Sequence, residues 1–443
     1  MVDSYFTDRA VTVHYAGQSS KRPTTKGCVQ GSIGGPTFWN LLLDPLLDDL
    51  TRQNVYCQAF ADDVIMVFSG HTANQIEIEA NEALAYVHDW GIKNKLRFAA
   101  HKTQAMVITN KLKFDVPNMH MGDKTIQIVD EMRVLGLTID SKLTFNSHVT
   151  QICKKTANIF KMVSRTAKIN WGLNSEIIRT IYVAVIEPTI LYAASAWAPA
   201  ANKIMTQKKL SVIQRGFAQK ISKTYRTVSL NAALVLAGLI PLDIRIQEAL
   251  VSAGCDIKLY WVRAHVGIPG NERADQLAKQ AAQYTRVSAH YDRIPISYTK
   301  RNIRLKSIET WHKRYQEGPT AAVTKIFLPD VDLAYRLVRQ IHLTPTMIQV
   351  MTGHGGFSAY LARFKCKEDP SCICNQGTEE TIQHLLLECP KYQKDRYELE
   401  NKTDTKLTIE TMHELISNKK ARPTFIEYCT KIAEEAILRN KTR

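Results

Sequence analysis

Two adjacent carboxylates, Asp62 and Asp63, lie between two short apolar runs of the chain. Apolar runs on both sides of a polar pair are typical of two strands that meet at a tight turn. Neighbouring carboxylates repel each other unless a cation neutralises them, and two-metal phosphoryl chemistry uses carboxylates to hold its Mg²⁺ ions. Asp is also common in ordinary turns. The pattern therefore predicts a metal-binding catalytic turn, with a plain polar hairpin as the alternative.

A glycine-rich loop, residues 27–35, precedes this pair and ends at Pro36. Glycines let a backbone approach a charged ligand closely, and Pro36 suits the first turn of a helix, whose start favours phosphate. By itself the loop also fits a flexible connector. A strand, a glycine loop, a helix and then a strand–Asp-Asp–strand hairpin is the element order of a polymerase palm.

The motifs resemble those of non-LTR retrotransposon reverse transcriptases of the Jockey-like clade. TKGCVQGSIGGP resembles their template- and nucleotide-contacting loop, AFADDVIMV their metal-binding turn, HKTQAMVI a lysine-bearing segment near the triphosphate, and RVLGLTID their primer-gripping hairpin. IEPTILYAASAW and ALVLAGLIPLD extend the resemblance into the thumb. The resemblance implies RNA-directed DNA polymerisation with Mg²⁺. It assigns catalysis to Asp62 and Asp63, and contact with nucleotide or template to Gln30, Gly31, Ser32 and Lys102.

The same resemblance implies a third palm carboxylate, on a strand upstream of the glycine loop. Residues 4–9 resemble the stretch that follows that strand, and Asp3 and Asp8 are the acids that precede the loop. Asp8 fits a turn better than a metal site. We therefore expect an N-terminally truncated palm without fingers and a catalytically incomplete polymerase. The alternative function is that of a non-catalytic nucleic-acid-binding relic of a transposable element.

WVRAHVGIPGNERAD, residues 261–275, resembles the last strand and helix of a type 1 RNase H. That resemblance implies a mobile-loop role for His265 and a metal-ligand role for Asp275, one of four acids in that family. Because Asp275 is the one acid of the four that is recognisable here, we expect an RNase H stub without catalysis.

Four of the nine cysteines cluster near the C-terminal end, and three of these share a short segment with a histidine. Three thiolates and one imidazole suit tetrahedral zinc, whereas reduced cysteines beside a helical histidine are the alternative. Flanking Glu-Thr and Cys-Pro pairs resemble the C-terminal knuckle of the same polyproteins, and Cys366 is a spare candidate. The predicted Zn²⁺ ligands are Cys372, Cys374, His384 and Cys389.

A net charge of +16, from 58 Lys and Arg against 42 Asp and Glu, indicates polyphosphate partners. Residues 145–168 alternate an apolar stripe with a basic face, which fits either a solvated surface or contacts to phosphates. We expect RNA, DNA or an RNA–DNA hybrid as the partner. The candidate phosphate-binding residues are Lys154, Lys161, Arg165 and Lys168.

These motifs require an α+β chain: a palm remnant with a small antiparallel sheet and helices, an all-helical thumb, an RNase H strand–helix stub and a small zinc-binding domain. The expected boundaries are residues 1–144, 145–250, 251–284, a helical linker at 285–350, and 351–443.

A hydrophobic fraction of 45% argues against bulk disorder. No signal peptide is visible, and Glu187 and Pro188 interrupt the longest apolar stretch, so we expect no membrane partner. Reduced cysteines indicate an intracellular chain, nuclear and cytoplasmic by family resemblance.

Overall fold

The computed structural model describes residues 2–24, 27–29, 31–166, 173–253, 273, 276, 296–341 and 343–441. The chain divides into two compact units, Met1–Leu143 and Thr144–Arg443, and each is described by itself. Four predicted site residues lie outside the described residues, together with most of the predicted RNase H stub: Gln30, Lys168, His265 and Asp275.

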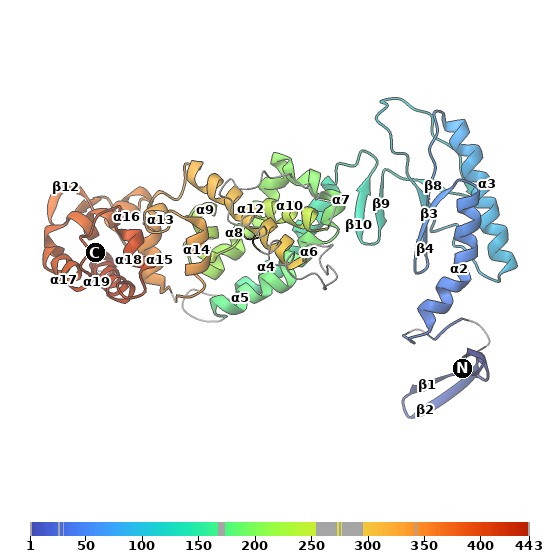
Figure 1. The fold of residues 1–443 in the computed structure, drawn as a ribbon, viewed down its shortest axis with the longest axis horizontal. Coiled ribbons are helices and arrows are strands. Elements are labelled where there is room, and N and C mark those ends of the chain that lie inside the picture. The colour runs from blue at the N-terminus through green and yellow to red at the C-terminus, as the bar shows by residue number, and fades with distance from the viewer. Residues whose placement is uncertain are drawn as a thin grey trace. The chain divides into compact units, whose positions relative to one another are not determined.

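The first unit alternates hairpins with two long helices (Figure 1). Pro36 stands in the first turn of the helix Gly35–Arg52, as predicted. Thr72 caps the helix Ala73–Lys93, since its side chain accepts a hydrogen bond from the backbone N–H of Gln75. The elements are α1 (Val2–Phe6), β1 (Ala10–Tyr15), β2 (Gln18–Pro23), α2 (Gly35–Arg52), β3 (Tyr56–Phe60), β4 (Asp63–Val67), α3 (Ala73–Lys93), β5 (Gln104–Ala105), β6 (His120–Met121), β7 (Lys124–Thr125), β8 (Gln127–Ile128), β9 (Glu131–Val134) and β10 (Leu137–Asp140).

The core of this unit lies between α2 and α3. Leu46 and Leu50 of α2 are fully buried against a set that includes Ala80, Leu84 and Val87 of α3, which recur at helical spacing. Burial of each large apolar side chain contributes about 1.5–3 kcal/mol. This packing gives the hairpin β3–β4 a surface to dock on, through its partly buried residues.

The expected single palm sheet is not what the described residues form. Their strands pair only in twos, and β5 pairs with β8 in parallel, whereas the other pairs are antiparallel. The inner face of β3–β4 packs on the helical core through Cys57, Ala59 and Met66, so side-chain burial holds this hairpin without a third strand beside it.

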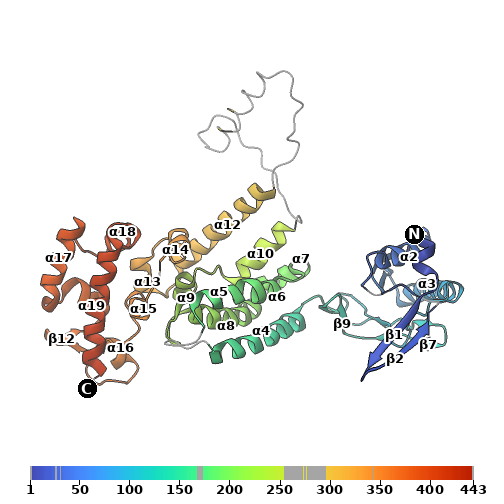
Figure 2. The same ribbon diagram turned by 90° about the horizontal axis from the view of Figure 1, so that it is seen from below.

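The second unit is helical up to residue 253 in its described part. α8 packs against α4, α5 and α9, and both views show these helices side by side (Figures 1 and 2). The elements are α4 (Asn146–Thr166), α5 (Ser175–Ile181), the π-helical η1 (Tyr182–Ile186), α6 (Glu187–Leu191), α7 (Ala194–Trp197), the 3₁₀ turn η2 (Ala198–Asn202), α8 (Ile204–Ser222), α9 (Leu230–Ala237) and α10 (Leu242–Ser252).

More helices and one small hairpin complete this unit, and α15 and α17 pack on the long last helix (Figure 2). That last helix is amphipathic, because Phe425, Ile432 and Ala436 on one stripe are fully buried. The elements are α12 (Ile296–Glu317), α13 (Ala322–Phe327), α14 (Val331–Leu337), α15 (Pro345–Thr352), α16 (Ser358–Arg363), β11 (Ser371–Cys372), β12 (Asn375–Glu379), the π-helical η3 (His384–Glu388), the 3₁₀ turn η4 (Pro390–Tyr392), α17 (Gln393–Thr403), α18 (Met412–Ser417) and α19 (Arg422–Lys441).

In the part of the chain that the structure describes, no single helix has both the length and the apolar character needed to cross a membrane. Ser175–Leu191 and Ala194–Asn202, bent by 53° at their break, satisfy that test only as a pair.

Candidate functional site

The predicted acidic turn is the tip of the hairpin β3–β4. Phe60 pairs with Asp63 across the two strands, so Ala61 and Asp62 form the turn, and both carboxylates are exposed. Ala61 has a φ of +53°, a left-handed conformation uncommon for a residue with a side chain. The indole Nε1–H of Trp39 on α2 donates to the carbonyl oxygen of Ala61 at 2.6 Å, which ties the tip to the helix. The strand–Asp-Asp–strand hairpin is therefore confirmed.

Tyr5, which no sequence motif singles out, holds the glycine loop. The hydroxyl of Tyr5 lies 2.7 Å from Ser32 Oγ and accepts a hydrogen bond from the backbone N–H of Val29 at 3.1 Å. Ser32 Oγ in turn accepts from the N–H of Gly35 at 3.0 Å. A Cβ on Gly35 would lie 2.9 Å from that same oxygen, so the close approach requires glycine.

The first turn of α2 joins the two motifs. Gly35, which closes the glycine loop, and Trp39, which binds the acidic tip, are one helical turn apart. A ligand whose phosphates meet the helix start would thus lie near the exposed pair Asp62 and Asp63. Oxygen ligands open to water are what Mg²⁺ uses, since it keeps several waters when bound.

Lys102 does not meet these motifs in the structure. Its side chain is exposed and its backbone N–H donates to the carbonyl of Ala99 at 2.8 Å, within a tight turn. Among the described residues, no hydrogen bond or ion pair joins Lys102 to the glycine loop or to the acidic tip. Its assignment to the nucleotide stays a prediction.

The structure brings the four predicted zinc ligands together in the second unit. One ligand atom from each of the four lies within 4.8 Å of the others. The Sγ atoms of Cys372 and Cys389 are 3.8 Å apart, and Cys374 Sγ is 3.2 Å from His384 Nε2. A tetrahedral zinc with bonds of about 2.3 Å separates two sulfurs by about 3.8 Å. The donor set and spacing therefore fit zinc, and Cys366 is not in the cluster.

The surroundings of this cluster suit a closed metal site. Cys372 and Cys389 are buried, and burial raises the pKa of the Cys389 thiol. A bound cation would therefore be needed to stabilise the thiolate form of this cysteine. Glu388 Oε2 lies 3.3 Å from His384 Nδ1 and leaves Nε2 to face Cys374. Glu388 is not among the residues predicted for this site, although its position four residues after His384 on a helix could have indicated it.

Comparison with known families places two matches on the chain. Residues 1–139 match the reverse transcriptase (RNA-dependent DNA polymerase) family, and residues 217–283 match the RNase H family. The first match contains the glycine loop and the acidic hairpin.

Curated relatives agree with these matches. The 115 kDa protein in type-1 retrotransposable element R1DM of Drosophila melanogaster is 27% identical over 88% of this chain. A retrovirus-related Pol polyprotein from type-1 retrotransposable element R1 2 of Nasonia vitripennis is 28% identical over 84% of it. The RNA-directed DNA polymerase from mobile element jockey of Drosophila melanogaster is 23% identical over 50%. The chain is a homologue of R1 and jockey non-LTR retrotransposon Pol proteins.

The chain spans 36% of the R1DM protein, 86% of the Nasonia polyprotein and 25% of the jockey polymerase. The RNase H match covers almost all of the predicted stub at 251–284. It begins earlier, at Phe217 on α8, and so also includes α9 and α10.

The predicted basic face lies on α4 of the Pol homologue. Val149, Ile152 and Val163 are buried, whereas Lys154, Lys161 and Arg165 are exposed. Neither α4 nor its neighbour α8 contains Asp or Glu. Two packed helices without a carboxylate present positive charge that is uncompensated within them, as phosphate contacts require.

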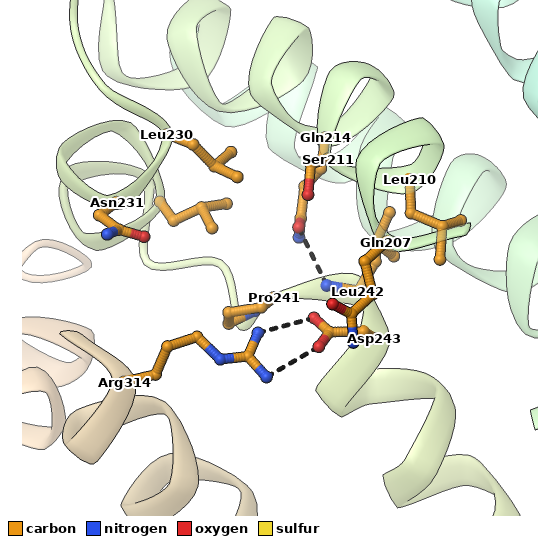
Figure 3. A pocket seen from close by; sticks show the side chains of 11 residues that line it. Gln207, Leu210, Ser211, Gln214, Leu230, Asn231, Pro241, Leu242, Asp243 and Arg314 are labelled. Carbon is orange, nitrogen blue, oxygen red and sulfur yellow. Dashed lines mark hydrogen bonds and ion pairs between the residues drawn. The ribbon is translucent and has the colours of Figure 1, made fainter. Parts of the chain in front are cut away.

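A cavity of about 190 Å³ lies within the second unit, between α8, α9, α10 and α12 (Figure 3). Arg314 pairs with Asp243 at 2.8 Å along one side of it. Gln214, buried opposite, accepts from the N–H of Leu242 at 3.0 Å and donates to the carbonyl of Ile240 at 2.7 Å. The side-chain amide of Gln214 is thus hydrogen-bonded to backbone groups of this loop, so Gln214 positions the loop before α10.

Proposed function

We propose that this chain acts in RNA-directed DNA synthesis by a non-LTR retrotransposon, with Asp62 and Asp63 as metal ligands. The observation that carries this is the exposed acidic tip, tied by Trp39 to the helix that opens at the glycine loop. Bound Mg²⁺ would neutralise charge on the transferred phosphoryl group. Ser32 and Gly31 would shape the loop beside the nucleotide, and Lys102 would contribute positive charge.

A template–primer duplex would contact α4 through Lys154, Lys161 and Arg165, with Lys168 next along the chain. Exposed lysine and arginine side chains on carboxylate-free helices support this assignment. His265 and Asp275 match residues of the RNase H family by resemblance alone. We propose no RNA cleavage there, because Asp275 is the one acid of that family's four that is recognisable in this sequence.

We further propose that Cys372, Cys374, His384 and Cys389 bind one structural Zn²⁺. Four buried or half-buried protein ligands leave no open position for a reacting water, which distinguishes a structural from a catalytic zinc. His384 and Cys389 flank η3, and the carbonyls of Leu386 and Cys389 accept from Arg396, so the metal would fix the start of α17.

Primer extension on an RNA template with Mg²⁺ tests the polymerase. If the chain is catalytically complete, it should extend the primer, and Asp62→Asn should lose about 100-fold or more of that extension, because electrostatic stabilisation of the transferred group carries much of such catalysis. Asp123→Asn, which changes an equally exposed turn carboxylate of the same unit, should extend normally.

Binding of template–primer without any extension would contradict polymerase activity of this chain. It would agree with the catalytic incompleteness expected from the sequence and favour the non-catalytic nucleic-acid-binding relic.

Metal analysis of the chain purified without chelator tests the zinc site. We expect about one zinc per chain. Cys389→Ser should lose it, whereas Cys366→Ser should retain it because Cys366 is exposed and outside the cluster. Equal zinc content in both variants would exclude this ligand set.

A further inference from the structure

A cluster of aromatic rings joins two distant segments of the second unit. The rings of Tyr225, His354 and Phe364 all lie against that of Tyr360, at centroid distances of 6.4, 5.0 and 4.8 Å. Tyr225 precedes α9, whereas the other three follow α15 or lie on and just after α16. The outer rings are 39% exposed at Tyr225 and 42% exposed at Phe364. Rings gathered to form a core would be covered, and these present their surface to solvent.

Polar bonds hold the two halves of the cluster together. Thr227 Oγ1 lies 2.9 Å from His354 Nδ1 and 2.8 Å from the hydroxyl of Tyr360. Burial and the nearby charge of Arg363 lower the pKa of His354, so its ring is neutral at pH 7. The cluster is therefore already assembled before any ligand arrives, which reduces the entropic cost of binding.

Side chains of α8 also hold the loop that carries Tyr225. Arg215 of α8 donates to the carbonyls of Arg226 and Val228 at 3.0 and 2.8 Å, and Gln219 donates to that of Arg226 at 3.2 Å. These bonds occupy the loop backbone and leave the Tyr225 and Arg226 side chains exposed.

The two segments that carry the rings bear charge of one sign. The segments 219–242 and 352–367 contain no Asp or Glu. Arg226, Arg363 and Lys365 are exposed within them. Exposed rings interleaved with cations match the chemistry of an unpaired nucleic-acid strand, whose bases stack on aromatic faces while its phosphates meet the cations.

We propose that Tyr225, Tyr360 and Phe364 form a stacking platform for the bases of single-stranded RNA or DNA, with Arg226 and Arg363 contacting its phosphates. This platform is separate from the basic face of α4, which is assigned to duplex. It rests on the proposed function only in taking nucleic acid as the ligand.

Fluorescence anisotropy with a labelled twelve-nucleotide oligo(U) RNA, an oligo(dT) DNA and an RNA–DNA duplex tests this platform in the full chain. Tyr225→Ala and Phe364→Ala should each weaken binding of a single strand by about tenfold or more, with duplex binding little changed. Tyr225→Phe keeps the ring and should restore affinity. Tyr397→Ala removes a ring 64% exposed on α17 and serves as the matched control.

A second readout locates the base directly. An oligonucleotide with 5-iodouridine, crosslinked by ultraviolet light and mapped by mass spectrometry, should label Tyr225, Tyr360 or Phe364.

Unchanged single-strand affinity in both alanine variants, or crosslinks elsewhere, would overturn the proposal. Self-association that these variants abolish would instead assign the patch to a second copy of the chain. Because the platform is measured by single-strand binding, it can fail while primer extension succeeds, and the reverse.

Discussion

At the scale of single residues, Glu380 shows how a charge is kept inside the second unit. Its side chain is fully buried, and its Oε1 accepts from the N–H and hydroxyl of Ser358 at 3.1 and 2.8 Å and from Asn440 at 2.7 Å. Its Oε2 pairs with Arg439. Burial alone raises the pKa of Glu380, but the bonds from Asn440 and Ser358 and the charge of Arg439 together lower it below its ordinary value.

We expect Glu380→Gln to destabilise the second unit by about 3 kcal/mol at pH 7, because it leaves Arg439 partly buried without its anion. A carboxylate whose pKa is lowered on folding stabilises above the ordinary Glu pKa of about 4.3, and this stabilisation disappears as the pH falls below it.

Urea unfolding between pH 3 and pH 7 measures both effects. Glu379→Gln, at the exposed neighbouring carboxylate, should change stability by less than about 0.5 kcal/mol. A Glu380→Gln deficit that persists unchanged at low pH would contradict the ionic explanation.

At the scale of elements, α4 packs on its neighbour through one face and carries its positive charge on the rest of its surface. Its apolar stripe contacts α8, and its remaining surface carries lysine and arginine without any carboxylate. Each phosphate contact releases condensed counterions, so binding through this face should depend steeply on salt.

Replacement of Lys154, Lys161, Arg165 and Lys168 by Gln should weaken duplex binding for all sequences and flatten the logarithmic salt slope by about 3.6, or about 0.9 for each of the four contacts. Affinity measured from low to physiological salt gives that slope. The same loss of charge at Lys402, Lys406, Lys419 and Lys420, exposed residues of the same unit, is the control. Equal effects of the two sets would mean that only net charge matters.

At the scale of the whole molecule, the chain consists of two compact units, and the cysteine cluster lies in the second. Each unit has its own buried core, so calorimetry should resolve two unfolding transitions. Zinc that binds only the folded state stabilises the unit that holds it.

A strong chelator should therefore lower the melting temperature of one transition and leave the other in place. Cys389→Ser should reproduce that shift without chelator, and Asp62→Asn, in the other unit, should not. Loss of both transitions together on chelation would show that the two units unfold as one.

The sequence by itself determined the features that depend on neighbouring residues. Apolar runs around Asp62 and Asp63 specified a hairpin, the apolar stripe of residues 145–168 specified α4, and closely spaced Cys and His specified a shared ligand cluster. Backbone geometry sets these relations over a few residues, since strand pairs, helical faces and metal ligands have fixed periods.

Only the tertiary structure decided which distant side chains meet. Tyr5 orders the loop at Ser32, Trp39 holds the acidic tip, and Thr227 bonds to Tyr360, which is 133 residues away in the chain. For the same reason the described strands pair in twos and do not form the one small sheet expected for the palm. Docking of β3–β4 on α2 and α3 is set by side-chain packing. Such contacts arise from complementary shapes and hydrogen bonds formed when cores close, and no local pattern in the chain encodes them.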